Sequence, residues 1–260
     1  MLELALASPE HFRDVRFVLT DMDETLTRHG RLSAATYTAL ERLQAGGFRV
    51  IPVTAAPSGW CDQMARMWPV DGVIAENGGL FLQRTPDGHG ITRQFWDDDR
   101  DAATLPARLR QLAESVSAVV PQARLADDQA FRLTSVAFSR TGDPVQDQAI
   151  VDALRAAGAD ATVNNLWVLG WFGGYDKLTM SRRVLASAFG LDVETSPDTL
   201  LYSGDSLNDA PMFSYFRHTV GVSTVRDYLP QLPKAPAWIT RGPGGEGFVE
   251  IADTLLAARR

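Results

Sequence analysis

The sequence has few of the features that would place a protein in a membrane, in an oxidising compartment or on a nucleic acid. Its 260 residues include a single cysteine, Cys61, so no disulfide can form within the chain. Its formal net charge is −7, which provides no excess of positive charge for nucleic acid or an anionic membrane surface. No apolar run is long enough to span a bilayer, and residues 1–16 lack the apolar core of a signal peptide. We therefore expect a cytoplasmic protein that binds neither membranes nor nucleic acids, with Cys61 as a buried thiol.

Two short apolar segments of the chain each end in carboxylates. Residues 17–19 run into Asp21 and Asp23, and residues 199–203 run into Asp205 and Asp209. In an open α/β sheet, ligands bind beyond the carboxyl ends of the strands. Aspartates also cap helices and turns, so either stretch alone has two interpretations. Their occurrence at two strand ends of one chain favours a divalent metal site over a pair of caps.

The first third of the chain alternates strand and helix. We expect strands at 17–19, 48–53 and 72–75, helices at 34–45 and 58–67, and a hairpin return strand at 80–82. Strand, helix and strand in this order predict a parallel sheet with a right-handed crossover. Thr54 then follows the second strand at the same edge as Asp21. Its hydroxyl could hold a phosphoryl oxygen or cap the next helix.

From about residue 85 the pattern changes. Strands at 91–96, 131–139 and 161–169 and helices at 105–119 and 145–157 predict a half-covered antiparallel sheet with helices on one face. We interpret residues 84–170 as an inserted α+β cap domain. Residues 1–83 and 171–260 then form the core domain.

The last third resumes the alternation of strand and helix. Helix 178–189 follows Lys177, and a core strand at 220–222 and a closing helix at 248–258 complete the chain. A cation at a helix N-terminus opposes the helix dipole unless it serves a nearby anion such as a phosphate. A single lysine is otherwise typical of a solvated surface. The whole pattern predicts an α/β protein with a Rossmann-like, doubly wound parallel sheet.

Four motifs occur in the order and at the sheet positions found in the haloacid dehalogenase (HAD) superfamily: residues 21–25, Thr54, Lys177 and residues 204–209. The chain resembles that superfamily along its whole length. The insertion between the Thr54 and Lys177 motifs resembles the type-IIB (C2B) cap of many sugar-phosphate phosphatases. Glu76-Asn77-Gly78-Gly79 and the closing glycine-rich turn are similar to the same group, in particular to mannosyl-3-phosphoglycerate and sucrose-phosphate phosphatases.

The resemblance implies a Mg²⁺-dependent phosphomonoester hydrolase that acts on a small phosphorylated metabolite, such as a sugar phosphate, through an aspartyl-phosphate. Asp21 would be the nucleophile, and Asp23 would protonate the leaving alcohol and then activate water. Mg²⁺ would be ligated by Asp21, the Asp23 carbonyl and Asp205, with Asp209 direct or one layer behind. Thr54 and Lys177 would hold the transferring oxygens, and Asn208 would orient that site.

Two positions depart from the resemblance. Glu24 stands where the motif usually has glycine, and Ala55-Ala56-Pro57 follows Thr54 where sugar phosphatases commonly have Gly-Arg. Both departures bear on the substrate more than on catalysis. Candidate contacts of the cap or hinge are Trp96, Arg132, Trp167, Trp171 and Tyr175, although aromatic packing is the simpler interpretation of each.

Other functions remain open on the sequence. A phosphotransferase or phosphomutase would use the same residues, and a signalling protein could carry a long-lived phosphate on Asp21. A dinucleotide-binding oxidoreductase would need a glycine-rich turn after the first strand, where this chain has acids. No feature of the sequence specifies an oligomeric state.

Overall fold

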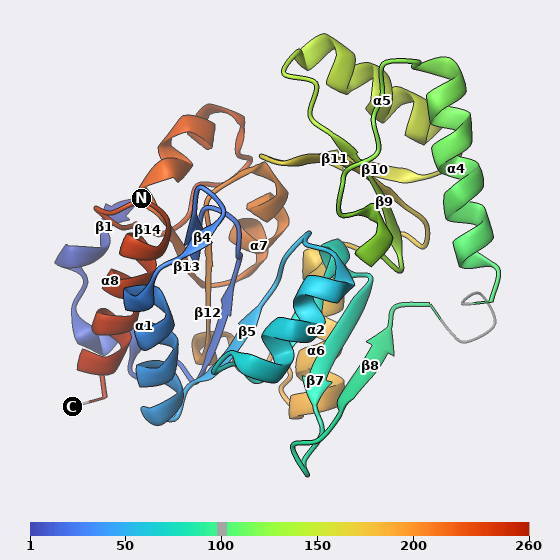
Figure 1. Ribbon diagram of the computed structural model, residues 1–260. Helices are drawn as coiled ribbons and strands as arrows, with labels where there is room; N and C mark the ends of the chain where they lie inside the picture. The colour runs from blue at the N-terminus through green and yellow to red at the C-terminus, as the bar shows by residue number, and fades with distance from the viewer. Residues whose placement is uncertain (98–102, 260) are drawn as a thin grey trace.

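A computed structural model of the protein describes residues 1–97 and 103–259. Its centre is a parallel sheet of six strands in the order β1-β14-β13-β12-β2-β5 (Figure 1). The strands are β1 (Leu2–Glu3), β2 (Phe17–Thr20), β5 (Arg49–Pro52), β12 (Leu200–Gly204), β13 (His218–Gly221) and β14 (Trp238–Ile239). Four helices flank the sheet: α1 (Ala34–Ala45), α6 (Lys177–Phe189), α7 (Ala210–Tyr215) and α8 (Gly244–Ala257). This is the predicted Rossmann-like core, with both faces of the sheet covered.

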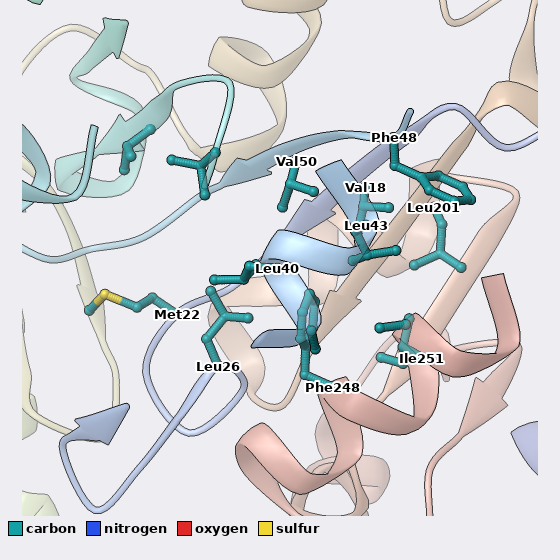
Figure 2. Packing of buried hydrophobic residues seen from close by; sticks show 14 of the residues in the cluster. Val18, Met22, Leu26, Leu40, Leu43, Phe48, Val50, Leu201, Phe248 and Ile251 are labelled. Atoms are coloured by element: carbon teal, nitrogen blue, oxygen red, sulfur yellow. The ribbon is translucent and has the colours of Figure 1, made fainter. Parts of the chain in front are cut away.

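Alternate residues of the central strands enter two separate hydrophobic clusters. Val18, Val50 and Leu201 point to the cluster that includes α1 and α8, and Figure 2 shows how Leu40 and Phe248 pack there. The intervening residues of the same strands point to the other cluster, with α6 and α7. Successive side chains of a strand point to opposite faces of the sheet, so a strand that is apolar at every position must be covered on both faces. Burial on both faces fixes the register of the strands and therefore the position of their carboxyl ends.

The edge of the sheet next to β5 continues into an antiparallel sheet formed by β6 (Val73–Ala75), β7 (Leu80–Arg84) and β8 (Ile91–Phe95). A parallel bridge between Val53 and Ile74 joins the two sheets, and α2 (Ser58–Met67) packs against β6 and β7. The strand predicted at 91–96 therefore pairs with the core hairpin and not with the sheet of the insertion.

The inserted segment forms a three-stranded antiparallel sheet in the order β10-β11-β9, with two helices on one face (Figure 1). Its elements are α4 (Leu105–Val119), β9 (Ser135–Ser139), α5 (Pro144–Ala156), β10 (Asp160–Val163) and β11 (Trp167–Trp171). The single strand predicted at 161–169 was wrong, because a turn at 164–166 divides it into β10 and β11. The strand predicted at 131–139 begins only at Ser135, since residues 129–131 form a 3₁₀ turn.

The second face of this inserted sheet is also covered. The side chains that pack there include Ala137, Leu169 and Trp171 of the cap and Ala55 and Tyr175 of the core. The prediction that one face of this sheet is exposed was therefore wrong. The helices α4 and α5 cover the opposite face, as expected. The cap sheet therefore lies directly on the loop that follows β5.

The remaining elements are short. They are the hairpin β3 (Thr27–Arg28) and β4 (Arg31–Leu32) and the 3₁₀ segments Leu4–Leu6, Pro9–Phe12, Glu76–Gly78, Gln129–Phe131, Pro197–Thr199, Leu207–Asp209 and Ser223–Gln231. The closing helix starts at Gly244, four residues before its predicted start. A Cβ at Gly245 would lie 2.8 Å from the Leu26 carbonyl oxygen, so the glycines allow α8 to approach the loop after β2. Across the described residues, no helix has the length and hydropathy needed to cross a bilayer.

Candidate active site

The carboxyl ends of three adjacent strands bring the candidate residues together. Thr20 of β2 is in register with Ser203 of β12 and with Pro52 of β5. The Asp21 amide continues this pairing by donating to the Ser203 carbonyl at 2.8 Å. Asp21, Asp205 and Thr54 therefore leave the sheet at one edge, as the parallel topology predicts.

Three carboxylates are buried at this edge. One oxygen each of Asp21, Asp205 and Asp209 lies within 4.8 Å of the others. Burial raises the pKa of Asp21 to about 6, although Lys177 opposes the shift. Burial and the charges of Asp21 and Asp209 raise the pKa of Asp205. The cluster thus holds more negative charge than its surroundings compensate, and a cation would stabilise it.

Lys177 is completely enclosed in this cluster. Its Nζ donates to Asp21 Oδ1 at 2.7 Å and to Asp209 Oδ1 at 2.8 Å. Its position at the start of α6 is fixed by a capping box between Asp176 and Thr179. Burial lowers the pKa of Lys177, but the two carboxylates outweigh it and raise that pKa overall. The surface interpretation of this lysine is therefore wrong.

Asp209 has both of its carboxylate oxygens engaged by the protein. Oδ1 accepts from Lys177 and from the Tyr202 hydroxyl at 2.5 Å. Oδ2 accepts from the backbone amides of Asp205 at 2.9 Å and Ser206 at 3.1 Å. A Cβ at Gly204 would collide with this carboxylate, which explains the glycine there. Asp209 thus shapes the turn after β12 and orients Lys177.

Asp205 has weaker protein partners than Asp209. Its Oδ1 accepts from Thr25 Oγ1 and its Oδ2 from Asn165 Nδ2, both at 3.3 Å. These contacts lie at the long end of the hydrogen-bond range, so the carboxylate has capacity for a stronger partner. Of the two acids on this turn, Asp205 is the one suited to ligate a metal directly.

Asp23 and Asn208 line a small cavity beside the cluster. Burial and the neighbouring charge of Asp21 raise the pKa of Asp23 to about 7. Asn208 Oδ1 accepts from the Ser206 hydroxyl at 2.7 Å. Thr54 is buried and is not among the described lining residues of the cavity, and its Oγ1 accepts from the Ala56 amide at 3.0 Å. In that contact the threonine oxygen is the acceptor, so its own proton remains available.

Glu24 occupies a left-handed backbone conformation with φ of 56°. A residue with a side chain is strained in this conformation, which glycine adopts freely. The Glu24 carboxylate turns back and accepts from the His29 amide at 2.6 Å. Its charge also contributes to the raised pKa of Asp23.

The cap contributes the turn between β10 and β11 to the site. Asn164, Asn165 and Leu166 line the cavity with Asp21 and Asp23. These residues were not among the predicted site residues because the strand predicted at 161–169 includes them. Two consecutive asparagines are a turn signal, and they could have revealed the hairpin.

The five residues predicted as cap or hinge contacts do not line this cavity, as far as the described residues show. Trp167, Trp171 and Tyr175 are buried, as the packing interpretation expected. Arg132 pairs with Asp128 at 3.2 Å in the interior. The Trp96 indole donates to the Gly173 carbonyl at 2.9 Å, at the junction of core and cap.

A further buried carboxylate, Glu76, connects core and cap, a contact that the motif around Glu76 did not predict. Glu76 accepts from the amides of Ser58 at 3.0 Å, Leu133 at 2.8 Å and Thr134 at 2.9 Å, and from the Ser135 hydroxyl at 2.7 Å. This residue follows β6 in the core, whereas three of its partners lie at the entrance to β9. Glu76 therefore fixes the start of the cap sheet against the core.

Neither protein-family models nor curated proteins match this sequence. Solved structures do match it, and they show that this chain shares the fold of HAD-like hydrolases. A haloacid dehalogenase-like hydrolase from Bacteroides thetaiotaomicron has a TM-score of 0.64 at 14% identity, covering 92% of this chain and 98% of that one.

Two further structures are similar over nearly their whole lengths. A Thermoplasma acidophilum protein has a TM-score of 0.69 at 20% identity, over 93% of this chain and 98% of its own. The sucrose-phosphatase of Synechocystis, solved with sucrose and phosphate, has a TM-score of 0.66 at 14% identity, over 94% and 98%. At these identities the similarity is one of fold.

Proposed function

We propose that the protein is a HAD-type phosphatase that hydrolyses phosphomonoesters of small metabolites with the help of Mg²⁺. The observation that carries this proposal is the buried acidic cluster of Asp21, Asp205 and Asp209, in which Lys177 pairs with Asp21 and Asp209, whereas the described contacts give Asp205 no cation partner. A purely structural cluster would balance its charges, because unpaired buried charge is costly. This cluster has carboxylates in excess at the sheet edge where ligands of α/β folds bind.

The donors of this site fit Mg²⁺, which prefers oxygen ligands and keeps several waters. We assign the ligands as the carboxylates of Asp21 and Asp205 and the backbone carbonyl of Asp23. The oxygens of Asp209 accept hydrogen bonds from Lys177, Tyr202 and two backbone amides. Asp209 would therefore not ligate the ion directly but would orient the residues around it. The bound ion would neutralise the phosphoryl oxygens and orient them for attack.

The residues of the chain then divide the chemistry between them. A carboxylate oxygen of Asp21 attacks phosphorus, and the bond from phosphorus to the alcohol oxygen breaks as Asp23 gives that oxygen its proton. Water attacks the aspartyl-phosphate, Asp23 takes its proton, and the bond to Asp21 breaks to release inorganic phosphate. A pKa near 7 suits Asp23 to both steps, because the residue can give and regain a proton at neutral pH.

Three further residues would hold the group in transfer. Lys177 is fixed against Asp21 and Asp209, and its remaining N–H can donate a hydrogen bond to a phosphoryl oxygen. We also assign the Thr54 hydroxyl and the Asn208 amide to this role, because Thr54 follows β5 and Asn208 lies in the turn after β12, at the same edge of the sheet. Fixed donors of this kind stabilise phosphoryl transfer because they need no reorganisation.

We assign the choice of substrate to the cap. Its elements run from α4 to β11, and β8 stays with the core because it pairs with β7. The sucrose-phosphatase whose fold this chain shares was solved with a sugar and phosphate, which supports sugar phosphates as the substrate class. A phosphotransferase would use the same residues, and adding acceptor alcohols to the assay distinguishes the two reactions.

The test is release of inorganic phosphate from a panel of phosphorylated metabolites and phenyl phosphate, with Mg²⁺ or with EDTA. We expect turnover only with Mg²⁺, and Asp21→Asn should lower it at least about a thousandfold. Asp14→Asn, the same substitution at an exposed site, should behave as wild type. Mg²⁺ binding without release from any ester would contradict hydrolysis and favour a phosphate-carrying signalling role.

A further inference from the structure

The turn between β10 and β11 is the part of the cap that enters the catalytic cavity. Its residues 164–166 line that cavity together with Asp21, Asp23 and Asn208. The cavity has a volume of about 10 Å³. That is room for about one water molecule. A phosphate ester can therefore enter only when the turn withdraws.

The turn itself is held rigidly within the cap. Asn164 Oδ1 accepts from the amides of Leu166 at 2.9 Å and Trp167 at 2.8 Å. Arg140 donates to the Asn164 carbonyl at 2.5 Å and is anchored by Asp147 at 2.6 Å. The turn thus moves with the cap sheet, and the orientation of the Asn165 side chain on it is fixed.

Asn165 is the cap residue that touches the acidic cluster. Its Nδ2 donates to Asp205 Oδ2 at 3.3 Å, and its Oδ1 accepts from the Tyr228 hydroxyl at 2.8 Å. Both partners belong to the core, so both bonds must break when the turn withdraws. The Asn165 amide then lacks one hydrogen-bond donor and one acceptor. A hydroxyl group of a ligand can replace both, because it donates one hydrogen bond and accepts others.

The charge of the cavity lining also favours a ligand with neutral hydroxyl groups. Its described lining includes two aspartates, three asparagines and a serine, with Ala55 and Leu166 as the apolar members and no lysine or arginine. Arg140, which contacts the back of the turn, is already paired with Asp147 and the Asn164 carbonyl, so a leaving group that carries a carboxylate would face the two acids of the lining and be repelled by them. A neutral alcohol with further hydroxyl groups would meet the amide of Asn165.

We propose that Asn165 is a specificity-determining residue that exchanges its bonds to Asp205 and Tyr228 for hydroxyl groups of a neutral leaving alcohol. The enzyme then prefers esters of neutral polyols to esters of hydroxy acids. This inference rests on the proposed phosphatase activity and assigns the choice of leaving group to one cap side chain.

The test compares kcat/KM for three esters that differ in the leaving group. Glycerol phosphate and phosphoglycerate are matched in size but differ in a hydroxymethyl or carboxylate group, and phenyl phosphate has no further polar group. Wild type should prefer glycerol phosphate to phosphoglycerate. Asn165→Ala should lower kcat/KM for glycerol phosphate about tenfold, as expected for two lost neutral hydrogen bonds, and leave phenyl phosphate within about twofold.

Two more variants separate recognition from folding. Asn165→Lys supplies the missing cation and should raise the relative rate with phosphoglycerate. Tyr228→Phe removes a partner of Asn165 but leaves its amide in place, so the ratio between the two matched esters should not change. Thermal unfolding of each variant establishes that it is folded.

The outcomes distinguish this inference from the function on which it rests. If wild type releases phosphate and the Asn165 variants keep its preferences, or lose activity equally on all three esters, the role of Asn165 is refuted and the phosphatase stands. If wild type releases phosphate from other members of the metabolite panel but from none of these three esters, only the inference about Asn165 fails. If it releases phosphate from no ester of the panel, both proposals fail.

Discussion

The two acids on the turn after β12 should respond in opposite ways to the same substitution. Asp209 accepts four hydrogen bonds through two well-placed oxygens, whereas Asp205 accepts two long ones. Exchange of each for asparagine keeps the shape and removes the charge. The structure predicts that Asp209→Asn strongly destabilises the metal-free protein and that Asp205→Asn stabilises it.

The expected size follows from the partners of each carboxylate. In Asp209→Asn an NH₂ group must face either Lys177 and Tyr202 or the two backbone amides. Two buried donors then lose their acceptor at about 1–3 kcal/mol each, so we expect a loss of about 4 kcal/mol. For a chain of this size that corresponds to roughly 8–16 °C in Tm. In Asp205→Asn the new amide can donate to Thr25 Oγ1 and still accept from Asn165, so both contacts can be kept.

The sign for Asp205 follows from its pKa. Because burial, Asp21 and Asp209 raise the pKa of Asp205 in the folded protein, its ionisation costs stability as pH rises through that raised value. The neutral asparagine avoids this cost. The stabilisation by Asp205→Asn should therefore be larger at pH 8 than at pH 5.

The assay is thermal unfolding followed by circular dichroism, in EDTA and in Mg²⁺. Mg²⁺ should raise the Tm of wild type, because a ligand that binds only the folded state stabilises it. The same addition should leave Asp205→Asn unchanged. Equal destabilisation by the two substitutions in EDTA, or a Mg²⁺ response retained in Asp205→Asn, would refute the division of roles.

Three further changes test other parts of the structure. Because Glu24 has φ of 56°, Glu24→Gly should be more stable than Glu24→Ala by about 1 kcal/mol in urea unfolding, and equal stability would contradict the left-handed turn. Glu76→Gln places an NH₂ against amide and hydroxyl donors and should cost about 2–4 kcal/mol, whereas Glu10→Gln on the surface should cost nothing measurable in the same experiment. Burial lowers the pKa of His218, although Asp198 opposes the shift. Wild type should therefore lose stability relative to His218→Gln as pH falls below about 6.5. A difference in unfolding free energy between the two proteins that stays constant from pH 8 to pH 5 would contradict the lowered pKa.

Sequence patterns predicted the core better than the cap because the core is built from apolar periodicity. Helix 34–45 and helix 58–67 have their predicted bounds, and the strand ends lie where the parallel topology puts them. The strand prediction at 131–134 failed for a physical reason. Arg132 and Thr134 are buried through polar partners, Asp128 and Glu76, while Phe131 is exposed. No hydrophobic pattern detects a buried polar contact between distant segments.

The glycine-rich stretch before α8 shows a similar limit. Glycine disfavours helix, so residues 242–247 indicate a turn by propensity alone. The helix nevertheless begins at Gly244. Glycine is needed at position 245 because a Cβ there would collide with the loop after β2, so these glycines reflect close packing and not a turn. The close approach of two segments more than 200 positions apart decides the local structure here.

The order of polar and apolar residues predicted which side chains meet at the edge of the sheet: acids at two strand ends, a threonine at a third and a lysine before a helix, which parallel strands must bring together. The hydrogen-bond partners of each residue, in contrast, depend on the packing of the whole chain. This packing buried Lys177 between Asp21 and Asp209, left Asp205 with weak partners, and placed Asn165 against that carboxylate. These contacts join residues 32 to 156 positions apart, and they depend on packing, which the residue pattern of each segment does not contain.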